Sequence, residues 1–186
     1  MGHKKTSNQL RIIGGEWRSR RIKFADAQGL RPTLDRVRET LFNWIQWDIE
    51  GAKVLDTFAG SGALGYEALS RGAKEVVFIE KDGKAAVAIK QALEELDAKN
   101  AQVWGGDALE YLKQTDGQFD LIFLDPPFNQ NLLPQACELL DGKLLSGTKI
   151  YLEVEASNPL SFIPESWQTL KRKDGKEFSF MLFEKN

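Results

Sequence analysis

Apolar runs and amphipathic segments alternate along most of this chain. Five apolar runs, at residues 53–58, 75–79, 101–104, 119–124 and 149–155, have the pattern of strands buried in a parallel sheet. Apolar residues recur at helical spacing in residues 34–47, 82–96, 109–113 and 132–140, and a glycine-rich turn leads into a further helix ending at residue 70. Two more strands, at residues 167–171 and 178–183, close the chain. This order predicts a doubly wound α/β sheet of seven strands, mostly parallel with an antiparallel edge strand.

A β-hairpin is predicted ahead of this sheet, at residues 10–24. Leu10 and Ile12 precede a Gly-Gly pair, and Ile22 and Phe24 follow a polar turn that contains arginines and Trp17. We expect residues 1–30 to form a basic arm that extends the fold without being a separate domain. Residues 31–186 are then expected to form the single domain.

Charge is distributed unevenly along the chain. The net charge is −2, but residues 1–38 carry ten lysines and arginines against three acids. A basic segment on an acidic body is typical of proteins that contact nucleic-acid phosphates, and an aromatic ring among arginines can stack on a base. The sequence alone also allows a solvated, disordered tail, or packing of Trp17 onto the body. The candidate RNA contacts are Arg11, Trp17, Arg18, Arg20, Arg21, Arg31, Arg36 and Arg38.

Bulk properties narrow the class of protein. With 186 residues the chain can bury a core without covalent cross-links, and its one cysteine cannot form an internal disulfide. One histidine and one cysteine give no cluster that would hold zinc, so we expect no metal. No apolar run is long enough to cross a bilayer, and the first residues lack the apolar core of a signal peptide. We therefore expect a cytoplasmic protein that does not bind membranes.

Residues 119–128 carry the most informative chemistry. The apolar run ends abruptly in Asp125, and Pro126 and Pro127 then remove two N–H donors and leave backbone carbonyls unpaired. Ligands bind at this position in open α/β sheets, beyond the carboxyl end of a central strand. Phe128 adds a ring that suits a planar ligand with an amino group, because the ring stacks while the oxygens accept N–H bonds. The simpler alternative is a strand-to-loop turn with no ligand.

Two acids flank a glycine loop in the first half of the sheet. Gly60, Gly62 and Gly65 satisfy the spacing of a dinucleotide-binding loop. Asp56, at the end of the preceding strand, would repel a pyrophosphate and suits a ligand with an ammonium or hydroxyl groups. Glu80, at the end of the next strand, suits both hydroxyls of a ribose. The pattern favours a nucleoside cofactor without choosing which one.

Three segments resemble known methyltransferases. Asp125-Pro126-Pro127-Phe128 resembles the (Asn/Asp/Ser)-Pro-Pro-(Tyr/Phe) motif of S-adenosylmethionine-dependent amino-methyltransferases. Residues 56–62 resemble the nucleoside-binding loop of Rossmann-like methyltransferases. The thirteen residues 31–43 resemble the signature of bacterial enzymes that methylate the N2 of a guanine in 16S ribosomal RNA, and the resemblance to that family extends from about residue 10 to the end.

The resemblance implies a Rossmann-like class I methyltransferase that uses S-adenosylmethionine. It further implies a ribosomal RNA substrate, free or within the small subunit, and we expect a monomer. The implied catalytic residues are Asp125, Pro126, Pro127 and Phe128. The implied cofactor contacts are Thr33, Asp56, Phe58, Gly60, Gly62, Glu80, Lys81, Asp107, Ala108 and Asp125. From the sequence, Thr33 and Asp107 are also good helix N-caps.

Other functions stay open at this point. The Asp-Pro-Pro-Phe motif also serves adenine-N6 DNA methyltransferases and protein glutamine methyltransferases, and it does not separate guanine from adenine. The chain is short for a DNA methyltransferase with a target-recognition domain. A nicotinamide dehydrogenase would use the glycine loop, and a non-catalytic RNA-binding protein would keep the basic arm. The lysine-rich residues 171–176 are interpreted as a simple hairpin connection.

Overall fold

The computed structural model describes residues 9–24, 35–116, 118–127 and 131–186. A seven-stranded sheet runs through the molecule in the order β5-β4-β3-β6-β7-β9-β8. Its strands are β3 (Lys53–Asp56), β4 (Glu75–Glu80), β5 (Ala101–Gly105), β6 (Leu121–Leu124), β7 (Lys149–Glu155), β8 (Trp167–Asp174) and β9 (Phe178–Lys185). The predicted sheet is confirmed. Strand β9 is antiparallel to both of its neighbours, and it lies next to the edge strand β8.

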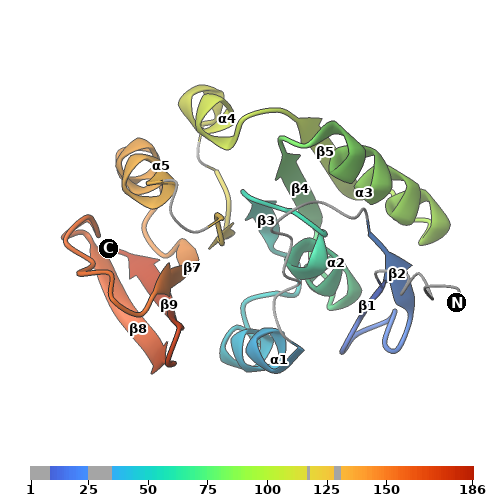
Figure 1. Ribbon diagram of the computed structural model, residues 1–186, viewed down its shortest axis with the longest axis horizontal. Coiled ribbons are helices and arrows are strands. Elements are labelled where there is room, and N and C mark those ends of the chain that lie inside the picture. The colour runs from blue at the N-terminus through green and yellow to red at the C-terminus, as the bar shows by residue number, and fades with distance from the viewer. Residues whose placement is uncertain (1–8, 25–34, 117, 128–130) are drawn as a thin grey trace, which may run out of the picture.

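Helices cover both faces of the sheet (Figure 1). They are α1 (Asp35–Trp44), α2 (Ala63–Ser70), α3 (Gly83–Glu95), α4 (Ala108–Gln114) and α5 (Leu132–Asp141). The apolar sides of α1, α2 and α3 pack with one face, and those of α4 and α5 pack with the other. The sheet is built outward from its centre in two directions. Strands β4 and β5 follow β3 on one side, and β7 follows β6 on the other. The carboxyl edge between β3 and β6 is therefore the switch point at which such sheets bind ligands.

Strand β6 lies at the centre of the core. All four of its side chains are at most 1% exposed, and they contribute alternately to the two apolar clusters. A strand buried on both faces needs an unbroken apolar sequence, which explains the run before Asp125. The strand ends at Leu124 because Pro126 and Pro127 have no N–H to continue its ladder.

The predicted N-terminal hairpin is also present, as β1 (Gln9–Arg11) paired antiparallel with β2 (Arg21–Lys23). Its turn is docked against the end of α2: the Glu16 N–H donates to Ser70 O at 2.7 Å, and the Trp17 N–H donates to Ser70 Oγ at 2.9 Å. Gly15 has φ +75°, and a Cβ there would lie 1.8 Å from Ser70 O. Only glycine allows this close approach.

Candidate active site

Four carboxylates meet at the carboxyl edge of the sheet. Asp56 ends β3, Glu80 ends β4 and Asp125 follows β6. Leu124 of β6 pairs with Leu152 of β7. The next residues along these two parallel strands, Asp125 and Glu153, therefore lie beside each other. The charges of Asp125 and Glu80 both raise the pKa of Asp56, and the charge of Asp125 raises the pKa of Glu153. We call these four residues the acidic cluster.

The glycine loop folds over this edge and is held there by backbone bonds. The Ala59 N–H donates to Ile79 O at 2.9 Å, and the Gly60 N–H donates to Glu80 Oε2 at 2.7 Å. Gly60 and Gly62 have φ of +54° and +80°, values that favour glycine. Thr57 Oγ1 is buried without a hydrogen-bond partner among the described residues. The glycines therefore allow the tight turn of the loop, and at Gly62 a Cβ would lie 2.6 Å from the Tyr66 ring.

The Glu80 carboxylate links the glycine loop to the turn that follows β4. Its Oε1 accepts the Asp82 N–H at 2.7 Å, while its Oε2 accepts the Gly60 N–H. Burial raises its pKa, since the charged form loses hydration, although these backbone bonds oppose the shift. Each carboxylate oxygen accepts two hydrogen bonds. With the Lys81 N–H as a further backbone donor, Glu80 is held mainly by the two loops, and its predicted contact with ribose hydroxyls stays a prediction.

The side chain of Asp56 is buried in the protein interior. It is 2% exposed, and its Oδ2 accepts the Gly65 N–H in the first turn of α2 at 3.0 Å. Burial raises its pKa to about 7, with further contributions from Asp125 and Glu80. Asp56 is thus an anchor of the glycine loop in this structure. Its predicted contact with a ligand stays a prediction.

The remaining predicted cofactor residues lie on the β4 and β5 side of the same edge. Asp107 is the N-cap of α4, as the sequence allowed: its Oδ1 accepts the Leu109 and Glu110 N–H groups at 3.0 and 3.4 Å. Lys81 Nζ lies 3.3 Å from Asp107 Oδ2. Ala108 is buried in the first turn of α4, and Phe58 is half-buried against the apolar cluster on that face.

The Asp-Pro-Pro segment is only partly described. Asp125 is half-buried, Pro126 is buried and Pro127 is exposed. The predicted partner Phe128 lies outside the described residues, as do Thr33 and Arg31. The roles assigned to these residues stay predictions.

Sequence reasoning missed Glu153 and its partner. The Tyr151 hydroxyl donates to Glu153 Oε1 at 2.5 Å, and Glu153 is 6% exposed. Burial, reinforced by the charge of Asp125, raises the pKa of Glu153 to about 8. The available signal was a glutamate between the apolar residues Leu152 and Val154, because acids are rarely buried without a specific environment.

We expect Glu153→Gln to flatten the pH dependence of stability. Because the folded-state pKa of about 8 exceeds the ordinary 4.5, Glu153 contributes stability at low pH that is lost as the pH rises through 8. Glutamine cannot ionise, so the variant should lose less free energy of unfolding between roughly pH 5 and pH 9. Urea denaturation at a series of pH values measures this. Equal losses in both proteins would contradict the assigned environment of Glu153.

Two of the predicted RNA contacts are corrected by burial. Trp17 is 9% exposed and packs in the apolar cluster of α1, α2 and α3, so it cannot stack on a base in this conformation. Arg38 is 1% exposed, and its Nη2 donates to Arg11 O and Asp35 Oδ1. The sequence suggested surface residues because Trp17 lies among arginines in a polar turn and Arg38 lies off the apolar stripe of its helix. Docking of the hairpin on the helices decided otherwise.

The hairpin turn also points toward the wrong edge of the sheet for contact with the acidic cluster. Helix α2 starts at the carboxyl edge, after the glycine loop, and ends near the start of β4 at the amino edge, where the turn docks on Ser70. Arg20 Nη2 donates to Glu95 O at the end of α3, which lies at the same amino edge. Arg18 and Arg20 are exposed but lie there, next to the exposed pair of Arg11 and Arg21. Arg36 is exposed in the first turn of α1, and the RNA contacts assigned to these arginines stay predictions.

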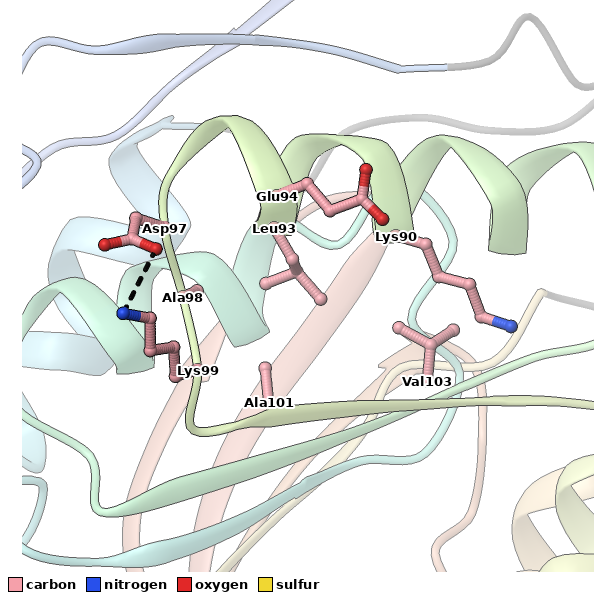
Figure 2. Close-up of a pocket in the computed structure, with 8 residues that line it drawn as sticks. All are labelled: Lys90, Leu93, Glu94, Asp97, Ala98, Lys99, Ala101 and Val103. Carbon is pink, nitrogen blue, oxygen red and sulfur yellow. Dashed lines mark ion pairs between the residues drawn. The ribbon is translucent and has the colours of Figure 1, made fainter.

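A hollow of about 490 Å³ lies between α3 and β5 (Figure 2). It is lined by Lys90, Leu93, Glu94, Asp97, Ala98, Lys99, Ala101 and Val103. None of the predicted site residues lines it, and β5 is the edge strand three positions from β6. Lys99 and Asp97 form an ion pair at its rim, and ion pairs as exposed as this one add little to the free energy of unfolding. The hollow is therefore separate from the candidate active site.

Neither a membrane span nor a metal site is found in the described ranges. No helix there is long and apolar enough to cross a bilayer. The same residues contain no group of three or more His, Cys, Asp or Glu side chains that could hold a metal ion.

Comparisons with known proteins give a consistent result. The family described as Conserved hypothetical protein 95 matches residues 10–184. The Haemophilus influenzae protein named ribosomal RNA small subunit methyltransferase D is 45% identical over 182 residues, covering 95% of this chain and 94% of its own length. The solved structure of Escherichia coli yhhF has a TM-score of 0.87 at 40% identity and covers 96% of this chain and 98% of that one.

One solved neighbour contains bound ligands. The T. thermophilus 16S rRNA N2 G1207 methyltransferase, in complex with AdoMet and guanosine, has a TM-score of 0.70 at 25% identity. The match covers 97% of this chain and 50% of that one. The predicted Rossmann-like fold is therefore shared with these proteins.

Proposed function

Because this chain belongs to the Conserved hypothetical protein 95 family, with relatives named ribosomal RNA small subunit methyltransferase D, we propose that it methylates the exocyclic N2 of a guanine in 16S ribosomal RNA. The methyl donor in this proposal is S-adenosylmethionine. The observation that carries the proposal is the position of Asp125 beside the glycine loop, at the switch point of the sheet.

The residues at the carboxyl edge fit this donor. Gly60 and Gly62 allow the tight turn that brings backbone over the strand ends, Thr57 Oγ1 lacks a partner among the described residues, and the Glu80 carboxylate ends the neighbouring strand, where it suits ribose hydroxyls. The carboxylates of the acidic cluster that are ionised favour a positively charged sulfur over a pyrophosphate. Bound there, the donor supplies a methyl group activated by the positive charge on its sulfur.

Asp125 and the Pro126 carbonyl are assigned to the target amine. The N2 lone pair of guanine is delocalised into the ring, so the amine is a poor nucleophile until that lone pair localises. Two acceptors that bind the two N–H groups favour the localised geometry, and they stabilise the nitrogen most as positive charge develops there. Transfer would form the N–C bond as the S–C bond breaks, with that bond's electron pair left on sulfur, and the methylated nitrogen would then lose one proton to Asp125 or to water. The base has to leave any helix to reach this edge, which favours unpaired RNA.

Product analysis tests the proposal. Small-subunit ribosomal RNA and assembled subunits, both from a strain that lacks the modification, are incubated with the protein and labelled S-adenosylmethionine, then digested to nucleosides. We expect label in N2-methylguanosine. Label in N6-methyladenosine, or in no nucleoside of either substrate, would contradict the proposal. Thermal shift with S-adenosylhomocysteine against NAD separates a methyltransferase from a dehydrogenase that uses the same loop.

A further inference from the structure

An acidic active site creates a difficulty for an RNA substrate. The acidic cluster supplies no cation for the phosphates of an RNA backbone, and those of its carboxylates that are ionised repel them. The arginines of the hairpin turn lie at the amino edge and are therefore remote from the target base. If RNA reaches Asp125, cations at the carboxyl edge have to hold its backbone.

The turn between β8 and β9 brings such cations to the correct edge. Strand β9 runs antiparallel to β7, and β8 runs antiparallel to β9, so the end of β8 and the start of β9 lie at the carboxyl edge. In register, Lys173 lies opposite Phe180, and Phe180 lies opposite Glu153 of the acidic cluster. Three strand spacings, about 14 Å in total, separate β8 from β6 and Asp125.

Three lysines, in the last part of β8 and in the turn after it, are available for phosphate. Lys171, Lys173 and Lys176 are exposed, and no ion pair or hydrogen bond joins their side chains to a partner within the described part of the chain. Arg172 differs, because its Nε binds the carboxylate of Asp174 at 2.9 and 3.1 Å. We call Lys171, Lys173 and Lys176 the basic hairpin. Strands β8 and β9 lie at the opposite end of the molecule from β1 and β2 (Figure 1).

We propose that the basic hairpin binds the phosphate backbone of the substrate RNA beside the target guanine. This proposal rests on the proposed function and names the surface that holds its substrate. Past Trp167, every residue of β8 is exposed, so no helix covers this end of the sheet. Lysines on an edge strand also discourage pairing with another chain, which makes an added protein strand a poorer fit than RNA. The flipped base would then enter the acidic cluster while its flanking phosphates stay on the lysines.

A triple variant, Lys171→Gln, Lys173→Gln and Lys176→Gln, tests the proposal. Binding to small-subunit ribosomal RNA transcribed in vitro is measured at several salt concentrations. Three lost phosphate contacts on single-stranded RNA should reduce the slope of log K against log salt by about 2, and should weaken binding at least tenfold near 0.1 M salt. In methylation assays KM for RNA should rise while kcat at saturating RNA is retained.

The matched control is Lys74→Gln, Lys90→Gln and Lys99→Gln. These lysines are exposed, carry the same charge, and lie on the α3 side of the molecule; two of them line the hollow in Figure 2. Both triple variants should keep the wild-type thermal unfolding and the thermal shift with S-adenosylhomocysteine. The control should bind RNA like the wild type.

Three outcomes would overturn the proposal. One is an equal loss of RNA affinity in both triple variants, which would indicate unspecific charge. A loss confined to the control would instead locate the RNA at the amino edge. Unchanged RNA binding with reduced activity on assembled subunits only would indicate a protein partner. Since binding is measured apart from methylation, a wild type that methylates no guanine would contradict the proposed function and leave this binding result interpretable.

Discussion

Asp125→Ala is expected to lower kcat by about 100- to 1,000-fold while leaving cofactor affinity within a few-fold of wild type. The reason is that Asp125 is assigned to the target amine, where an acceptor contributes most as positive charge develops on nitrogen. The cofactor is assigned mainly to the glycine loop and Glu80, which do not depend on Asp125 for their backbone bonds. Single-turnover methylation and calorimetric titration with S-adenosylhomocysteine measure the two effects separately.

The control for this prediction is Asp97→Ala, which removes an exposed carboxylate far from β6. It should have wild-type kcat and wild-type affinity for the cofactor. If Asp125→Ala weakened cofactor binding as much as it slowed turnover, Asp125 would belong to the cofactor site and the assigned contact with the amine would be wrong.

The second large effect is expected for stability, from Glu67→Ala. Glu67 is fully buried in α2, and its two oxygens accept the Ile13 and Gly14 N–H groups at 2.9 and 2.8 Å. It also binds Arg71 Nε at 2.8 Å and lies 3.7 Å from Nη1 of the buried Arg38. Removing it leaves a buried cation and two backbone donors without this acceptor. We expect a loss of about 3–5 kcal/mol in the free energy of unfolding.

Urea denaturation measures this loss, and hydrogen exchange locates it. The amides of Ile13 and Gly14 should exchange much faster in Glu67→Ala, because this carboxylate is their acceptor in the docked hairpin. Glu39→Ala, at an exposed position of α1, should change stability by no more than about 0.5 kcal/mol. A loss below about 1 kcal/mol for Glu67→Ala would mean that the hairpin is held mainly by its apolar contacts.

The order of elements and the location of the site could be predicted from sequence because they depend on chemistry local to the chain. The apolar run of β6 requires burial on both faces, and the two prolines after Asp125 end the strand whatever its neighbours are. Gly60 and Gly62 mark a turn by their backbone freedom. These features place Asp56, Glu80 and Asp125 at the ends of parallel strands, so their meeting at one edge follows from the fold class.

The partners of the charged and aromatic side chains could not be predicted in the same way. Trp17 and Arg38 are buried because the hairpin docks on α2, through a glutamate more than 50 residues away in sequence. Glu153 joins the site, and the lysines after Trp167 reach the same edge, because of the register of β6, β7, β9 and β8. Hydrophobic periodicity specifies which face of a strand is buried, whereas register and docking depend on contacts between distant segments. Only the folded chain decides which charges lie together.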